Sequence, residues 1–129
     1  MPGAPFELYR GRQLNRRRVG DRGEALALEY LAEKGYTPIE RNYRTRFGEI
    51  DLVVRDEGTL VFVEVKLRRG TDFGNPLEAV TPRKRARIRL VAELYLAEKG
   101  TSYDEVRFDV VGILLRAGKP EVRHVEDAF

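Results

Sequence analysis

One stretch, residues 59–67, does most to narrow the folds open to this chain. It is an almost continuous run of Leu, Val and Phe, which is typical of a central strand covered on both faces. Two charged residues, Glu64 and Lys66, nevertheless lie within it. Burying a charge costs free energy unless the charge is paired or bound to a metal. Both side chains therefore need a partner from elsewhere in the fold.

Two helices are predicted from apolar residues at helical spacing. The first covers residues 19–34, and the second covers residues 82–99, with Thr81 as its N-cap. The predicted core stripe of the first helix is Ala25, Leu28, Leu31 and Ala32.

Strand-like segments occupy most of the remaining chain. They cover residues 36–44, 49–55, 59–67 and 106–115, with a short one at 121–125. Pro38 favours an edge position for the first strand, and alternation puts Ile50, Leu52 and Val54 on one face of the second. The order is α-β-β-β-α-β(-β), in which an antiparallel hairpin precedes a right-handed parallel crossover. We therefore expect an α/β fold with a mixed sheet and flanking helices.

The composition limits the kinds of site that this chain can build. Its 129 residues suit a single domain covering residues 1–129, with a loosely ordered basic arm at residues 1–14. The absence of cysteine excludes disulfides and cysteine-based zinc sites. The presence of one histidine, His124, argues against a His-rich metal site and a Ser-His-Asp triad. A metal would therefore have oxygen ligands, as Mg²⁺, Mn²⁺ and Ca²⁺ prefer. No apolar stretch approaches the roughly 20 residues of a membrane span, and no signal-peptide core is present, so we expect a cytoplasmic protein with no membrane partner.

A hairpin of the second and third predicted strands would bring acidic side chains together. An even-numbered loop pairs Asp51 with Glu64, whereas a three-residue loop puts these two residues on opposite faces. The same even register sets Glu49 against Lys66. Directly opposed residues have Cβ atoms roughly 4.5–5.5 Å apart, so the two carboxylates repel each other unless a cation such as Mg²⁺ lies between them. An internal salt bridge of Lys66 with Glu64 or Glu49, without a metal, is the competing interpretation.

Two further acids have roles that the sequence leaves open. Glu24, in the first helix, is either a third carboxylate of the same centre or the partner of Asp21 in a helix-capping box. Asp109 lies in an apolar strand. We interpret it as a buried structural acid paired with Arg107 or Lys66 rather than as a metal ligand.

Basic residues gather in two segments, 10–22 and 83–89, of a chain whose net charge is only +3. In the second segment they occupy the first turns of a helix, where the helix dipole disfavours cations. An anionic partner is therefore favoured over a merely solvated face. Contacts to phosphate alone give affinity without sequence specificity. The candidate nucleic-acid-binding residues are Arg17, Arg18, Arg22, Arg83, Lys84, Arg85, Arg87 and Arg89.

The acidic motifs resemble those of a nuclease superfamily. Gly48-Glu-Ile-Asp51, followed by Val63-Glu-Val-Lys66, is similar to the split motif of the PD-(D/E)XK nucleases, with Ile50 in place of the proline in that name. The sequence is closer still to the YraN-like family of small bacterial proteins. The residues that carry this second resemblance span nearly the whole chain: Arg22-Gly-Glu24, Gly48-Glu-Ile-Asp51, Val63-Glu-Val-Lys66, Pro76-Leu-Glu-Ala-Val80, Arg107-Phe-Asp109 and Ala128-Phe129.

The resemblance implies a restriction-endonuclease-like three-layer fold, similar to that of Holliday-junction resolvases. The catalytic residues that it implies are Glu24, Asp51, Glu64 and Lys66, with Asp51, Glu64 and the Val65 carbonyl as ligands of Mg²⁺ or Mn²⁺. The implied activity is metal-dependent hydrolysis of phosphodiester bonds, with DNA favoured over RNA and with selectivity for DNA structure. A homodimer would suit the cleavage of two strands.

Two other classes of function stay open. One is a nucleic-acid-binding protein of the same fold with little or no intrinsic catalysis. The other is an adaptor whose basic helices bind acidic protein surfaces. Mn²⁺ calorimetry beside a DNA cleavage panel separates the first class from the nuclease hypothesis, and the absence of salt-dependent DNA binding would favour the adaptor.

Overall fold

The computed structural model describes residues 18–69, 76–99, 102–116 and 119–129, with side chains from residue 22 onward. The predicted N-terminal arm at residues 1–14 and Arg17 lie outside the described residues. Across the described ranges, no helix is long and apolar enough to cross a membrane.

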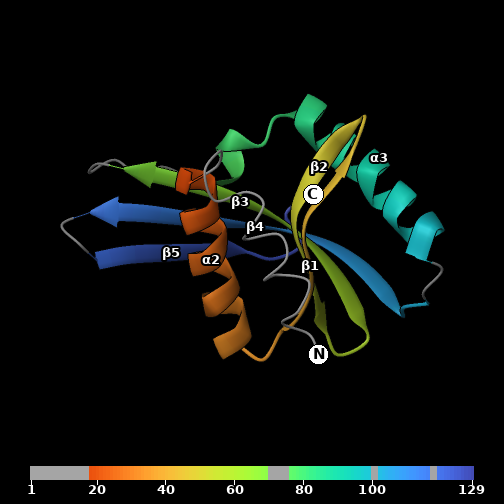
Figure 1. Ribbon diagram of the computed structural model, residues 1–129, viewed down its shortest axis with the longest axis horizontal. Helices are drawn as coiled ribbons and strands as arrows, with labels where there is room; N and C mark the ends of the chain where they lie inside the picture. Colours follow the sequence, from red (N-terminus) through yellow and green to blue (C-terminus); the bar gives the residue numbers. More distant parts are fainter. Residues whose placement is uncertain (1–17, 70–75, 100–101, 117–118) are drawn as a thin grey trace.

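A five-stranded mixed sheet in the order β1-β2-β3-β4-β5 forms the middle layer of the molecule (Figure 1). Strands β3 and β4 are parallel, and the other neighbours are antiparallel. The elements are α2 (Arg18–Glu33), β1 (Thr37–Thr45), β2 (Gly48–Asp56), β3 (Thr59–Arg69), the 3-10 helix η1 (Pro76–Ala79), α3 (Pro82–Lys99), β4 (Glu105–Arg116) and β5 (Lys119–Val125). The predicted α/β class, element order and mixed sheet are confirmed.

The local signals that predicted these elements are visible in the structure. The Lys84 N–H donates a hydrogen bond to Thr81 Oγ1 at 3.2 Å, so Thr81 caps α3. Strand β1 is at the edge of the sheet, and its register with β2 shifts between Pro38 and Glu40. Proline cannot donate a ladder hydrogen bond, which explains why this strand is at the edge and irregular.

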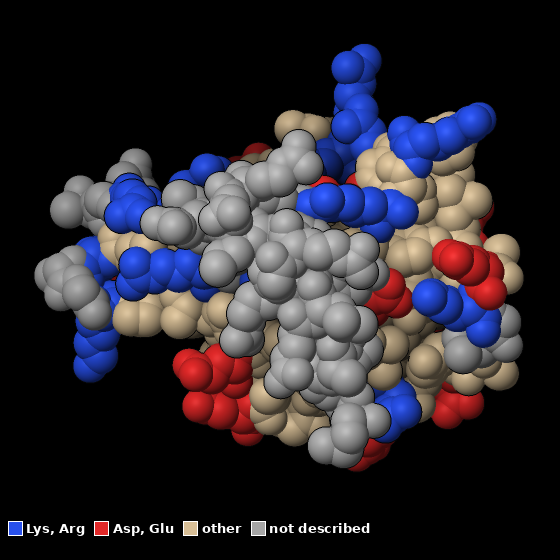
Figure 2. All heavy atoms as spheres, in the orientation of Figure 1, with Lys and Arg blue, Asp and Glu red and all other residues tan. Residues whose placement is uncertain are grey.

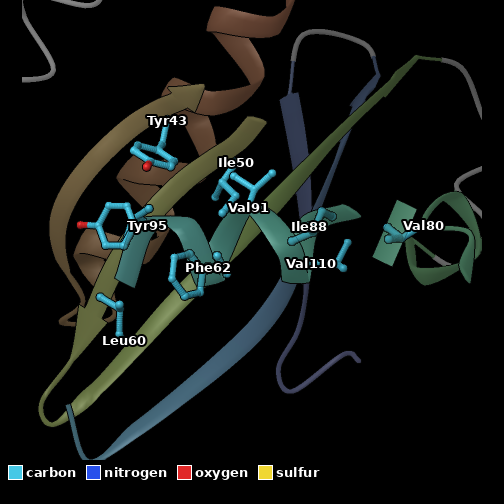
Figure 3. Packing of buried hydrophobic residues seen from close by; sticks show 11 residues of the cluster. Tyr43, Ile50, Leu60, Phe62, Val80, Ile88, Val91, Tyr95 and Val110 are labelled. Atoms are coloured by element: carbon cyan, nitrogen blue, oxygen red, sulfur yellow. The ribbon is translucent and has the colours of Figure 1, made fainter. Parts of the chain in front are cut away.

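Helices cover both faces of the sheet. Helix α2 packs on one face, whereas α3 packs on β2 from the other (Figures 1 and 3). Alternating side chains of β3 join the two cores: Val61 and Val63 belong to the α2 core, and Leu60 and Phe62 belong to the α3 core. In Figure 3 the side chain of Tyr95 on α3 lies beside Phe62, with the ring centroids 5.5 Å apart.

The core stripe of α2 differs from the predicted one, because Ala25 and Ala32 are exposed. Among the side chains of this helix that the structure describes, from residue 22 onward, the buried residues are Gly23, Glu24, Ala27 and Leu31. A Cβ on Gly23 would lie 3.2 Å from the Cβ of Leu67, so α2 approaches β3 closely at this point. The stripe is rotated because the acid Glu24 occupies an inward position, which apolar periodicity does not reveal.

The turn between β2 and β3 consists of Glu57 and Gly58, since Asp56 pairs with Thr59. The predicted even-numbered loop is therefore confirmed. Glu57 has a φ of 55°, and tight hairpin turns need a positive φ at this position. A Cβ at Gly58 would collide with the carboxylate of Asp104, so a larger residue would force that side chain to move.

Asp109 on β4 is fully buried, and its pairing with Arg107 confirms the structural interpretation. Its carboxylate accepts two hydrogen bonds from Arg107 at 2.9 Å and one from the Asp127 N–H at 3.0 Å. His124 Nε2 lies 2.8 Å away. Burial tends to raise the pKa of Asp109, but the hydrogen bonds from His124 and Arg107 bring that pKa below its usual value. The ionised carboxylate thus stabilises the fold above the unfolded pKa of roughly 3.9, and this contribution is lost as the pH falls through the lower folded pKa.

Asp109→Asn is expected to destabilise the protein by about 3 kcal/mol at neutral pH, because it breaks a buried ion pair. Urea unfolding measures this difference, which should shrink as the pH is lowered below about 4. The exposed Asp104→Asn is the control and should change the free energy of unfolding by less than about 0.5 kcal/mol. An Asp109→Asn protein as stable as the wild type would contradict the structural role.

Candidate metal centre

The candidate centre lies where β2 and β3 stop pairing. The last pair in their register is Leu52 with Val63. The next positions are Asp51 and Glu64, which the same register sets opposite each other, as the even loop predicts. Asp51 Oδ2 accepts a hydrogen bond from the backbone N–H of Val65 at 2.8 Å. The carboxylate thereby satisfies a backbone donor of β3 that would otherwise need another acceptor.

The side-chain alternation of β2 breaks at Asp51. Ile50 packs in the α3 core, whereas Leu52 and Val54 pack in the α2 core, so the prediction that these three share one face is wrong. In the register of β1 with β2, Arg41 pairs with Leu52 and Tyr43 pairs with Ile50, so Asn42 lies opposite Asp51. Asn42 has a φ of 59°, a left-handed conformation that is uncommon outside glycine. This local twist leaves Asp51 between the two layers of the fold.

Three carboxylates converge at the twist. The side-chain oxygens of Glu24, Glu49 and Asp51 all lie within 4.8 Å of one another. Glu24 comes from α2 and is buried, and the other two come from β2 and are half-buried. Sequence reasoning gave Glu49 only a pairing with Lys66, because strict alternation does not show that the twist brings it close to α2. In the structure the Glu49 carboxylate is 3.4 Å from Arg44 Nε.

Glu24 is a member of this acidic group rather than a capping residue. Asp21 lies inside α2, so the capping-box alternative is wrong. Glu24 Oε1 accepts hydrogen bonds from Asn42 Nδ2 at 2.9 Å and from Arg41 Nε at 3.3 Å, and both donors are buried. Nothing in the sequence marked these two donors, because they belong to a polar stretch of an edge strand, where side chains are usually exposed.

Glu64 lies next to the acidic group, but it is bound to two lysines. Its buried carboxylate is 2.6 Å from Lys84 Nζ and 3.3 Å from Lys66 Nζ. The Lys66–Glu64 salt bridge considered from the sequence is therefore present, and Lys84 is a second partner that was not foreseen. Burial, followed by the neighbouring Lys84, lowers the pKa of Lys66. The assignment of Glu64 and the Val65 carbonyl as metal ligands stays a prediction.

The electrostatics of Asp51 suit a cation. Burial raises the pKa of Asp51 well above its usual value, and repulsion by the three neighbouring carboxylates adds to this rise. The hydrogen bond from Val65 partly offsets it. Hard divalent cations bind oxygen ligands, often one or two carboxylates together with water. The residues present therefore fit Mg²⁺ or Mn²⁺ in donor type.

The basic residues of α3 divide between two sides of the helix. Lys84 and Arg87 point to the side of the centre, where they contact Glu64 and Gly48. On the other side, the guanidinium groups of Arg85 and Arg89 each lie 5.6 Å from the ring centroid of Phe129. Arg85 Nε also donates a hydrogen bond to the Val80 carbonyl at 2.9 Å, and Arg89 lies 5.1 Å from the ring centroid of Phe108. Figure 2 shows Lys and Arg side chains gathered where the β1–β2 hairpin tip and the start of α3 lie in Figure 1.

The other predicted nucleic-acid contacts are spread more widely. Arg22 on α2 and Arg83 on α3 are exposed. Arg18 begins α2, but its side chain is not among those described, and Arg17 lies outside the described residues. The structure thus brings Lys84 and Arg87 to the acidic centre, and it holds Arg85 and Arg89 against an aromatic ring.

The chain is similar to other proteins over most of its length. Residues 23–113 match the family model of the Uncharacterised protein family UPF0102. A UPF0102 protein of Syntrophomonas wolfei is 50% identical over 113 residues, which cover 88% of this chain and 98% of the relative. UPF0102 proteins of Rhodococcus jostii and Symbiobacterium thermophilum are each 49% identical, covering 86% and 88% of this chain and 95% and 97% of the relatives. The matched range includes every residue of the acidic centre.

Asp51→Asn is expected to raise the Tm of the metal-free protein by a few degrees. A carboxyl group whose pKa is raised in the fold makes the wild type less stable as the pH rises from the unfolded pKa, roughly 3.9, toward the folded pKa. The amide removes that charge and keeps an acceptor for the Val65 N–H. Differential scanning calorimetry at neutral pH with a chelator measures the change.

The matched control for this change is Asp56→Asn, at the other end of the same strand, where the side chain is 41% exposed. Its Tm should stay within about one degree of the wild type, because surface substitutions usually change stability little. A lower Tm for Asp51→Asn than for Asp56→Asn would contradict the electrostatic account of the centre.

Proposed function

The chain belongs to the Uncharacterised protein family UPF0102, and we propose that it is a divalent-metal-dependent nuclease that hydrolyses DNA phosphodiester bonds. One observation carries this proposal: Glu24, Glu49 and Asp51 converge to within 4.8 Å of one another. The Glu64–Lys66 ion pair lies beside them. A group of acids with an adjacent lysine is suited to a hard cation and a phosphate.

The sheet supports the further proposal of a restriction-endonuclease-like fold. Strands β1, β2 and β3 are antiparallel, with Glu49 and Asp51 on β2 and Glu64 on β3, and α3 then leads to the parallel strand β4. Asp51 on β2 and the Glu64-Val-Lys66 segment on β3 correspond to the split acidic motif of the PD-(D/E)XK superfamily. The likeness to Holliday-junction resolvases belongs to the same proposal.

The residues of the centre take distinct roles in the proposed reaction. Asp51 and Glu49 offer carboxylate oxygens to Mg²⁺ or Mn²⁺, and Glu24 offers another, oriented by Arg41 and Asn42. The bound metal supplies Lewis-acid stabilisation of the phosphate and lowers the pKa of a water molecule. Lys66, whose pKa is lowered, holds the attacking water and balances charge on the phosphate.

Lys84 connects substrate binding to the availability of Glu64. In the structure its ammonium group neutralises the Glu64 carboxylate. A DNA phosphate that enters the centre competes for this ammonium group, because both are anions that it can bind. Glu64, no longer paired with Lys84, would then be available to hold the metal together with Asp51.

Asp51→Ala and Glu64→Ala are each expected to abolish Mg²⁺- or Mn²⁺-dependent cleavage without unfolding the protein, because each removes an oxygen donor or the partner of Lys66. Cleavage is measured on duplex, single-stranded, flap and junction DNA, and thermal unfolding reports the fold. Glu93→Ala, which changes an exposed acid on α3, is the control and should cleave like the wild type. Cleavage at the wild-type rate by both variants would contradict the assignment of Asp51 and Glu64 to the catalytic site.

Mn²⁺ calorimetry on the same proteins tests the alternative function. The wild type and Glu93→Ala should bind Mn²⁺, and Asp51→Ala should not. Binding of Mn²⁺ and DNA without cleavage of any DNA in the panel would favour a nucleic-acid-binding protein that lacks intrinsic catalysis. If salt-dependent DNA binding is also absent, the result favours the adaptor hypothesis instead.

A further inference from the structure

A hollow of about 610 Å³ lies beside the acidic centre, at the tip of the β1–β2 hairpin. Its walls are residues 44–49 and Arg87 of α3. This volume falls within the roughly 300–1,000 Å³ of sites that bind small molecules. Three of the lining residues are arginines and one is a phenylalanine. The hollow thus combines cationic groups with one aromatic ring.

The aromatic ring is that of Phe47, which is 44% exposed. Its position is held by the turn, because the Phe47 N–H donates to Thr45 Oγ1 at 3.0 Å, and Thr45 Oγ1 donates to the Gly48 carbonyl at 3.1 Å. The Arg46 guanidinium lies 5.0 Å from the ring centroid. A ring presented in this way, with a guanidinium group over it, is suited to stacking against a nucleobase.

The side chain of Arg87 passes close to Gly48 to reach the hollow. A Cβ on Gly48 would lie 2.9 Å from Arg87 Cδ, so any larger residue at this position would force the arginine away. Gly48 also has a φ of 148°, which L side chains rarely adopt. The exposed Arg87 therefore joins Arg46 on the wall of the hollow, and guanidinium groups are well suited to binding phosphate.

Glu49 connects the hollow to the acidic centre. It lines the hollow, and its carboxylate also lies within 4.8 Å of Glu24 and Asp51. A nucleotide in the hollow is therefore next to the site where the phosphodiester would be cleaved. Paired bases in a duplex are stacked inside the helix, and exposing one costs a few kcal/mol. The hollow thus fits an unpaired base better than a paired one.

We propose that this hollow binds an unpaired nucleotide of the DNA substrate, with its base on Phe47 and its phosphate between Arg46 and Arg87. The inference rests on the proposed nuclease function and specifies its substrate class. That class is single-stranded DNA, or branched DNA with unpaired bases beside the scissile phosphodiester.

The test is fluorescence anisotropy in the presence of a chelator, so that binding is measured apart from cleavage. The probes are a labelled oligothymidylate and a labelled blunt duplex of the same length. Phe47→Ala should weaken binding of the oligothymidylate about tenfold, which is within the range for loss of one stacked base. It should change duplex binding by less than about twofold. Phe47→Trp should keep the oligothymidylate affinity, and Phe47→Leu should lose it, because leucine has no π face.

Val106→Ala is the matched control, since Val106 is also a large exposed hydrophobic residue but does not line the hollow. It should bind both probes like the wild type. Equal affinity of Phe47→Ala and the wild type for oligothymidylate would overturn the inference. An equal loss on both probes would also overturn it, because stacking on an unpaired base cannot act on a blunt duplex.

A photochemical measurement locates the base directly. An iodouracil-containing single strand, irradiated on the wild-type protein and analysed by mass spectrometry, should crosslink to Phe47. A crosslink confined to residues outside the hollow would contradict the inference. Phe47-dependent binding in a protein that cleaves no DNA would overturn the nuclease proposal alone, whereas full cleavage and binding by Phe47→Ala would overturn the inference alone.

Discussion

The two-residue turn at Glu57 and Gly58 determines which side chains meet farther along β2 and β3. Side chains alternate across a strand, so a loop longer by one residue would move Glu64 to the opposite face from Asp51. Glu57 has the positive φ that a two-residue hairpin turn needs at this position. The placement of Glu64 opposite Asp51 therefore depends on a turn that takes no part in the chemistry of the centre.

The charges of the centre are compensated unevenly. Glu64 lies against two lysines, and Glu24 is bonded to Arg41 and Asn42. Asp51 is bonded instead to the neutral N–H of Val65, and its pKa is raised by burial and by the neighbouring acids. Metal binding and stability are thus in opposition at Asp51, because the charge that would attract a cation weakens the cation-free fold. Such conflicts between stability and function are common at active sites.

The sequence correctly predicted the features that depend on residues close together along the chain. Thr81 as an N-cap, Pro38 on an edge strand and the even loop each follow from a few neighbouring residues, and the structure confirms all three. Within the candidate site, the membership of Glu24 in the acidic group was one of two open alternatives. The twist at Asn42, which brings Glu49 into that group, was not foreseen because buried contacts between distant segments stabilise it.

Both edges of the sheet carry residues that oppose the addition of another strand. Strand β1 has Pro38 and a shift in register, and β5 begins with exposed Lys119 and Pro120. Proline lacks the amide hydrogen that a docking strand requires, and an edge lysine would lose hydration under it. The sheet is thereby protected against edge-to-edge aggregation, and extension of the sheet by a second copy of the chain is disfavoured.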